Sequence, residues 1–256
     1  MEDKKNKLPV FKILLEAIQS IWHNKIVLLQ KTGLPILILL GLAYAQTLLA
    51  SSSGFAIFVL SLVSLIFYTY LAVNIHRVAL LGQDSVQGYG LRSFAKRERK
   101  FTLWLVSIYV LVFFITMILT LTATFIANIL GKYGTYTAVI FTVLLSSYFI
   151  SRLLIMLPAT AVDYDPDVYW AWDASSGNGW RLVVIICLIP LLTGTLVALI
   201  DFTNTNIIYN MLKELLSSIF VIFGIVSLSL SFQYLQDNNS NKALNTDTAK
   251  DAAPVC

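Results

Sequence analysis

The stretch from residue 101 to residue 131 constrains this chain most, because it carries no charged side chain. As a helix, thirty such residues reach ~45 Å, whereas the hydrocarbon core of a bilayer is ~30 Å thick. The composition agrees with a membrane setting, since 57% of the residues are hydrophobic and only 12% are charged, about half the charged share of a soluble domain. The stretch therefore predicts a transmembrane helix that tilts or extends beyond the lipid.

Further apolar stretches approach the same length, and short polar links separate them. Helices joined by short links pack as antiparallel neighbours. We therefore expect an all-α integral membrane protein whose six transmembrane helices form three hairpins, within a single membrane domain over residues 1–236. The expected spans are 33–50, 54–75, 101–130, 136–157, 180–200 and 215–235. Residues 237–256 are polar and lack hydrophobic periodicity, which predicts a disordered tail.

A short amphipathic helix is expected at residues 9–24, ahead of the first span. Its apolar and polar residues occupy opposite faces at helical spacing: Phe11, Leu14, Leu15, Ile18 and Trp22 against Lys12, Glu16, Gln19 and His23. Such a helix is too short and too charged to span, so it should lie in the membrane interface on the cytoplasmic side. The alternative is a soluble helix that packs on a cytoplasmic partner.

Lysine and arginine residues concentrate on one side of the expected threading. Of the 18, the N-terminal segment, residues 76–100, residues 152–181 and the tail hold 16, and the other side has only Lys132 and Lys213. Cytoplasmic loops of membrane proteins carry an excess of Lys and Arg. The charge distribution therefore predicts a multi-pass protein with both termini in the cytoplasm.

The most basic segment precedes the third span, where Arg92, Lys96, Arg97, Arg99 and Lys100 stand within nine positions. A short interfacial helix here would rest on anionic lipid headgroups, and each basic side chain would contribute about 1 kcal/mol of attraction. The same pattern is compatible with a specific lipid or phosphate site and with a plain topology signal.

Arg77, Arg152 and Arg181 lie close to the cytoplasmic ends of expected spans. Ionisable residues within membrane segments are functional candidates, but an arginine this near the boundary can extend its head group into water. These arginines therefore form either a ligand-binding ring or a set of anchors and structural ion pairs. We hypothesise that Asp163 pairs with Arg152 or with Arg181. The candidate lipid or partner site comprises these four residues and the basic segment.

The run Asp163-x-Asp165-x-Asp167 imitates the start of a calcium-binding loop. The sixth position of such a loop needs glycine and the twelfth needs glutamate, whereas this chain has Val168 and Ala174. We therefore predict no metal site here. Asp165 followed by Pro166 instead predicts the N-cap and first residue of a short interfacial helix.

No nucleophile-elbow, phosphate-loop or zinc-protease motif occurs in the sequence, and the net charge of +4 is too small to indicate nucleic acid. We therefore expect a non-enzymatic protein without a cofactor, which organises lipids or partner proteins through its cytoplasmic face. The first alternative is a small-solute or lipid transporter whose path runs between hairpins. The second is a membrane-embedded lipid-modifying enzyme that uses the arginine and aspartate residues.

Three short motifs resemble a family of bacterial inner-membrane proteins similar to the membrane domain found ahead of some glycerophosphodiester phosphodiesterases. The motifs are His76-Arg77-Val78-Ala79-Leu80-Leu81-Gly82, Leu157-Pro158-Ala159-Thr160-Ala161-Val162-Asp163 and Gly177-Asn178-Gly179-Trp180-Arg181-Leu182. The resemblance covers most of residues 10–236 and implies a six-helix domain in the bacterial inner (cytoplasmic) membrane. The soluble phosphodiesterase barrel has no counterpart in this sequence, so its chemistry does not carry over.

Overall fold

The structure is a computed structural model that describes residues 7–49, 54–86, 88, 94–188, 191, 194–195 and 207–251. Most of these residues are helical and none of them lies in a β-strand, which confirms the all-α prediction. In chain order the elements are α1 (Val10–His23), α2 (Lys25–Leu49), α3 (Gly54–Leu81), η2 (Gln83–Ser85), α4 (Lys96–Leu153), α5 (Met156–Ala161), α6 (Val168–Ala174), α7 (Gly179–Val183), η3 (Val184–Leu188) and α9 (Ile207–Asp251).

Five helical segments among the described residues are long and apolar enough to cross a membrane: Lys25–Leu49, Gly54–Leu81, Lys96–Ile126, Tyr136–Ala161 and Leu212–Asn238. These segments are compatible with a multi-pass membrane protein. The fifth span expected from the sequence, 180–200, lies partly outside the described residues. Its beginning is seen in α7 and η3.

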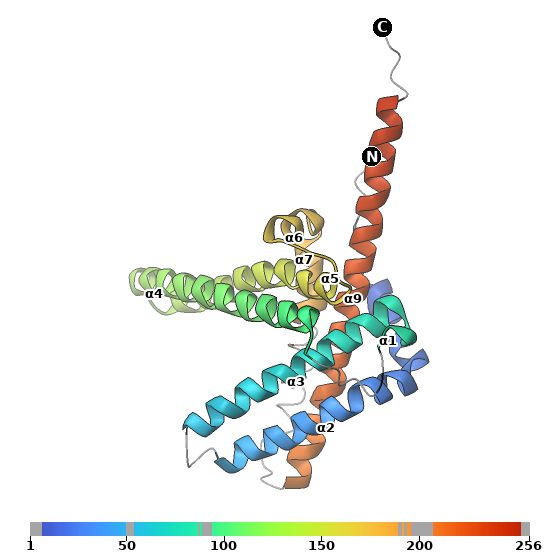
Figure 1. Cartoon of the computed structure of the whole chain (residues 1–256). Helices are drawn as coiled ribbons and strands as arrows, with labels where there is room; N and C mark the ends of the chain where they lie inside the picture. The colour runs from blue at the N-terminus through green and yellow to red at the C-terminus, as the bar shows by residue number, and fades with distance from the viewer. Residues whose placement is uncertain are drawn as a thin grey trace.

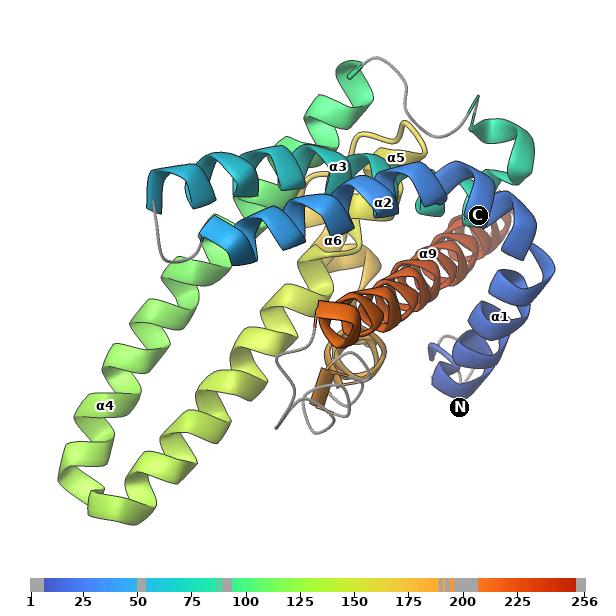
Figure 2. The same ribbon diagram turned by 90° about the horizontal axis from the view of Figure 1, so that it is seen from below.

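The long element α4 consists of two legs, because its helix is interrupted at Gly131. This residue has φ 67° and ψ −153°, a conformation open almost only to glycine. Figure 2 shows the second leg folding back alongside the first. The break falls in the link between the expected spans 101–130 and 136–157. The two legs contact each other through hydroxyl groups, with Thr116 Oγ1 3.2 Å from Ser146 Oγ.

The helices diverge from a common junction (Figure 1). The pair α2 and α3 projects in one direction and the two legs of α4 project in another, while α9 passes through the junction beside α1 and α3. The buried core lies at this junction, where Val73, Phe101, Ile155, Met156 and Leu182 are almost inaccessible to solvent.

The outer parts of the helices expose large apolar side chains, among them Leu37 of α2 and Phe113 of α4. A soluble monomer rarely exposes extended apolar surface of this kind. In a bilayer the same surface contacts acyl chains at no hydrophobic cost, and each helix satisfies its own backbone hydrogen bonds. The exposed outer parts therefore fit a lipid environment.

The first helix, α1, matches the amphipathic helix expected at residues 9–24. It buries Ile13 and Ala17, and it packs against α9. The apolar side chains of Phe11, Leu15 and Trp22 remain exposed. The helix therefore has a second apolar face, distinct from the face that packs on the protein.

The last helix, α9, continues to Asp251, whereas the sequence predicts a disordered tail from residue 237. Adding residues to an existing helix is far easier than starting one, and the tail includes good helix formers such as Lys242 and Leu244. Within the membrane-length part, the small residues Ser227 and Ser231 are fully buried. Small side chains permit the close approach of neighbouring helices.

Candidate functional site

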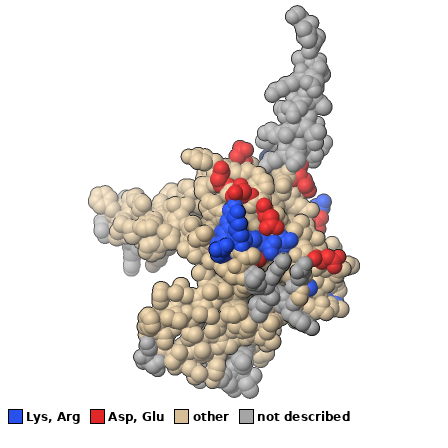
Figure 3. Space-filling view, in the orientation of Figure 1, with Lys and Arg blue, Asp and Glu red and all other residues tan. Residues whose placement is uncertain are grey.

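The charged residues gather where the helices converge (Figure 3), while the two projecting helix pairs show almost none in this view. We use the term charged junction for two neighbouring groups of ion pairs at this end of the molecule, the linked set Arg77–Asp163–Arg97–Glu98 and the pair Lys100–Asp165. It is formed by the end of α3, the first turn of α4 and the segment that follows α5: Arg77, Arg97, Glu98, Lys100, Asp163 and Asp165.

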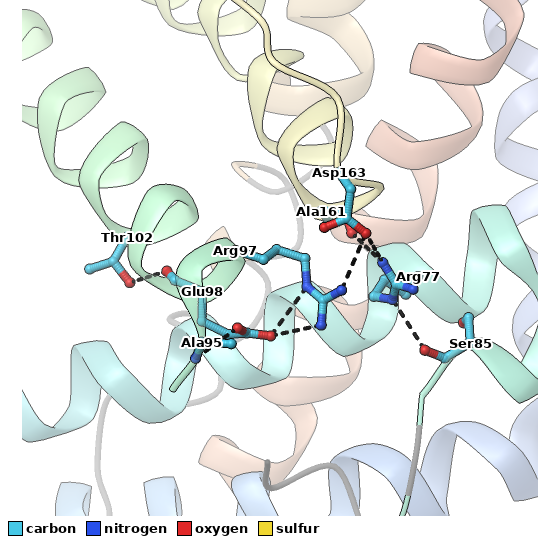
Figure 4. Close-up of polar contacts among 8 residues, drawn as sticks. All are labelled: Arg77, Ser85, Ala95, Arg97, Glu98, Thr102, Ala161 and Asp163. Atoms are coloured by element: carbon cyan, nitrogen blue, oxygen red, sulfur yellow. Dashed lines mark hydrogen bonds and ion pairs between the residues drawn. The ribbon is translucent and has the colours of Figure 1, made fainter. Parts of the chain in front are cut away.

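The carboxylate of Asp163 lies between two guanidinium groups (Figure 4). Its Oδ2 is 2.9 Å from Arg77 Nη1 and 3.3 Å from Arg97 Nη1. The hypothesis that Asp163 pairs with Arg152 or Arg181 is therefore wrong. Both of those arginines have other partners: Arg152 contacts Tyr148 of α4 and residues of α6 and its C-cap, and Arg181 of α7 donates to Leu8 O.

The backbone at Asp163 is left-handed, with φ 66°. The Asp163 N–H donates to Thr160 O at 3.2 Å and the Tyr164 N–H donates to Ala159 O at 3.0 Å, the pair of bonds that defines a Schellman ending of a helix. Glycine usually occupies this position because it has no Cβ, but aspartate tolerates it better than most residues. The end of α5 thus presents a carboxylate to α3 and α4.

Arg77 joins three segments. Besides Asp163, its Nη1 donates to Ala161 O at 3.0 Å and its Nε donates to Ser85 O at 3.2 Å. Only 14% of the Arg77 side chain is exposed, so the pair with Asp163 is shielded from water on the arginine side. Arg77 therefore fixes the end of α3 against both η2 and α5.

Glu98 organises the start of α4. Its carboxylate accepts a hydrogen bond from the Ala95 N–H at 3.1 Å. The same carboxylate forms an ion pair with Arg97, whose Nη2 is 3.0 Å from Glu98 Oε1. The side chain is only 4% exposed. Glutamate at this position satisfies a backbone donor that the helix leaves unpaired. Lys100, two residues on, contacts the carboxylate of Asp165.

The predicted basic segment is thus divided in two. Arg97 and Lys100 take part in the charged junction, whereas Lys96 and Arg99 are exposed and form no ion pair with any residue that the structure describes. Arg92 lies outside the described residues. The side chains of Lys96 and Arg99 are therefore accessible to groups outside the protein.

Arg152 is buried among neutral groups. Its Nε donates to Ser175 Oγ at 2.7 Å and its Nη1 to Tyr148 Oη at 3.1 Å, while Nη2 contacts Trp172 O. Its Cζ lies 3.7 Å from the centroid of the Trp172 ring, a distance suited to a cation–π interaction. These contacts attach α6 to the end of α4, so Arg152 acts as a structural anchor.

Arg181 and Asn178 hold the N-terminal segment. Arg181 Nη1 donates to Leu8 O at 2.8 Å, and the Leu8 N–H donates to Asn178 Oδ1 at 2.7 Å. Leu8 itself is completely buried. Both backbone polar groups of Leu8 are therefore satisfied, by the N-cap of α7 and by Arg181 within α7, as buried backbone groups require.

The N-cap of α6 is Asp167, whose carboxylate accepts a hydrogen bond from the Trp170 N–H at 2.6 Å. The prediction of an N-cap at Asp165 is wrong by two residues. Asp165 faces Lys100 instead, and Pro166 precedes the helix rather than beginning it.

Sequence reasoning missed Glu98, Tyr148 and Asn178. Glu98 had a signal, because a single glutamate among five basic residues at the beginning of an apolar run is typical of the third helical position. Tyr148 had a weak signal, because it stands one helical turn before Arg152 and donor and acceptor meet at that spacing. The partner of Asn178 is Leu8, 170 residues earlier in the chain, so no local pattern marks it.

Helices of membrane length that meet at a polar junction define a helical protein of membrane-protein type. Comparisons of the chain with protein-family models, with curated proteins and with solved structures found no match. Among the described side chains, no group of three or more His, Cys, Asp or Glu residues is placed to hold a metal ion.

Proposed function

We propose that this chain is a non-enzymatic protein of the bacterial inner membrane that organises anionic lipids at the cytoplasmic surface. In this proposal six spans form three hairpins, both termini are cytoplasmic, and the charged junction lies at the inner boundary of the bilayer. The observation that carries the proposal is the presence of exposed cations, Lys96 and Arg99, beside a junction whose other charges are paired internally.

The exposed apolar face of α1 supports the same orientation. Phe11 and Trp22 are 84% and 73% exposed, while the next face of the helix packs on α9. Interfacial helices bind anionic membranes through an apolar face together with basic side chains, and α1 exposes both, since the Lys12 side chain is 70% exposed. Residues of α1 and the first turn of α4 would then contact the same layer of headgroups.

The proposal is tested with the double variant Lys96→Gln/Arg99→Gln. Removing two cations from an anionic surface removes about 2 kcal/mol of attraction, roughly a thirtyfold fall in preference. Native mass spectrometry of the purified protein, titrated with mixed phosphatidylglycerol and phosphatidylethanolamine, would measure that preference.

The matched control is Lys132→Gln, because the proposed threading has Lys132 on the opposite side of the membrane. The control should keep the wild-type preference for phosphatidylglycerol. Equal preference in the wild type and in the double variant would contradict the proposal, and an equal loss in the control would show that the effect is not specific to the inner surface.

A small-solute or lipid transporter is the second candidate, and a cavity of about 430 Å³ between α3, α4 and α9 favours it. A transporter would move a fluorescent phospholipid or a solute across vesicles that contain the purified protein. Transport that exceeds the rate in protein-free vesicles would favour this candidate over a protein that only binds lipid.

A further inference from the structure

A cavity of about 430 Å³ lies among helices of membrane length. One wall is α3, with Tyr68 and His76, a second is the first leg of α4, with Phe101 and Leu105, and α9 supplies much of the remainder. This volume is within the range of sites that bind small molecules. The lining is mainly apolar.

The two ends of the cavity differ. Toward the charged junction it is closed by Phe101, His76 and Leu228, which are all buried. The His76 Nδ1 lies 2.7 Å from Ser229 Oγ, so this polar ring already has a partner on α9. The closed end therefore offers apolar contacts to an occupant.

The opposite end is accessible. Tyr109 is 64% exposed there, and the polar lining residues Lys213, Glu214 and Ser217 belong to this part of α9. Along α9 the lining runs from Lys213 to Leu228, which corresponds to ~22 Å of helix. One leaflet of hydrocarbon is only ~15 Å thick, so the cavity is long enough for a whole acyl chain.

We propose that this cavity binds one acyl chain of a phospholipid, with the end of the chain at Phe101 and Leu228 and the headgroup beside Lys213 and Glu214. Three observations lead to this occupant. The walls are helices apolar enough to be surrounded by lipid. The deep end is closed by buried side chains, of which only His76 is polar and already has a partner in Ser229. The charged lining residues, Lys213 and Glu214, lie at the open end. The proposal goes beyond the headgroup contacts of the proposed function, but it rests on the same membrane setting.

Gly224 makes the proposal testable. The sequence places Gly224 on a small-residue face, which predicts close helix packing, but in the structure it lines the cavity, and a Cβ added to it would meet no atom within 4 Å. A leucine at this position can therefore extend into the space that the acyl chain would fill. Gly41 of α2 is the matched control, because a Cβ there also meets nothing and Gly41 does not line the cavity.

The experiment uses the full chain in vesicles that contain phosphatidylethanolamine with a photoreactive diazirine at the end of one acyl chain. After illumination, peptide mass spectrometry would locate the adducts. We expect adducts at the closed end, on Phe101, Leu105 or Leu228, and at least a fivefold loss of these adducts in Gly224→Leu. Gly41→Leu should retain them. Adducts on the exposed face of α4, for example at Phe113, should be equal in all three proteins.

Unchanged adducts at the closed end in Gly224→Leu would overturn the proposal, as would their absence from the wild type. If Gly224→Leu does not purify as a single species, Ser217→Leu reduces the same cavity from its open end and carries the same expectation. The outcome is separable from the headgroup test, because Lys96→Gln/Arg99→Gln should leave the closed-end adducts intact, and Gly224→Leu should leave the preference for anionic lipid intact.

Discussion

Asp163 combines two roles that glycine or asparagine could fill only in part. Its left-handed backbone ends α5, and its carboxylate meets Arg77 and Arg97. Glycine would suit the backbone but would leave two mostly buried guanidinium groups without this carboxylate. The aspartate is 58% exposed, so each ion pair contributes at the modest level of a partly solvated pair.

Substitutions at Asp163 should separate the two roles. Asp163→Ala and Asp163→Gly both remove the ion pairs, but only alanine is strained by a left-handed backbone. Alanine should therefore lower the free energy of unfolding by about 1 kcal/mol more than glycine. Asparagine also tolerates a left-handed backbone, so Asp163→Asn should have a free energy of unfolding close to that of Asp163→Gly. Thermal unfolding in detergent would measure the differences.

Asp165→Ala is the control for this series, because the Asp165 side chain is 82% exposed. Its stability should stay within about 0.5 kcal/mol of the wild type. If Asp163→Ala and Asp163→Gly lower the free energy of unfolding equally, the left-handed backbone at position 163 does not contribute to stability as argued.

The short helices α6 and α7 are held in place by their packing on the end of α4. The first residue of α7, Gly179, lies against the Tyr148 ring. The centroids of the Tyr148 and Trp180 rings are 5.1 Å apart. Tyr148 also accepts a hydrogen bond from Arg152. Short helices are marginal without tertiary contacts, so this aromatic contact region is what positions the turn that holds Leu8.

Gly179→Ala should disturb this contact. An added Cβ would lie 2.5 Å from Tyr148 Cε2, so the Tyr148 ring must shift, which disturbs its contacts with Trp180 and Arg152. We expect a loss of about 1–3 kcal/mol in the free energy of unfolding, as for other overpacked sites.

Gly41→Ala provides the comparison, since a Cβ there has open space and alanine favours the helix. Its melting temperature in detergent should equal or exceed that of the wild type. Equal effects of the two substitutions would argue against close packing of α7 on Tyr148.

At the scale of the whole molecule, the charged junction and the exposed apolar outer parts of the helices divide the protein into a polar end and a lipid-compatible body. The division agrees with the uneven distribution of lysine and arginine along the sequence. Such a protein should have one orientation in the membrane, because the positive-inside rule acts on the same residues.

Reporter fusions test this orientation. The charge asymmetry predicts that a reporter fused after an outer link is external and that one fused after an inner link is cytoplasmic. The external sites are Ser53, Lys132 and Asn204, and the cytoplasmic sites are Gly82, Asp165 and Asp237. An external reporter after Asp165 would contradict the six-span threading.

Much of the helical framework followed from the sequence alone. The apolar runs predicted helices of membrane length, and the amphipathic pattern of residues 9–24 predicted α1, because both depend on local periodicity and on the thickness of the bilayer. The break between the legs of α4 was also predictable, since Gly131 stands between two uncharged runs.

The tertiary structure alone decided the polar partners. Asp163 pairs with Arg77, 86 residues earlier in the chain, and Arg181 binds Leu8, 173 residues earlier. Each arginine offers several hydrogen-bond donors, and several arginines lie near the same expected membrane boundary. The local sequence therefore could not show which arginine pairs with Asp163. Packing decided the pairs, because the Schellman ending of α5 directs Asp163 to α3 and α4, while α6 and α7 enclose Arg152 and bring Arg181 to the N-terminal segment.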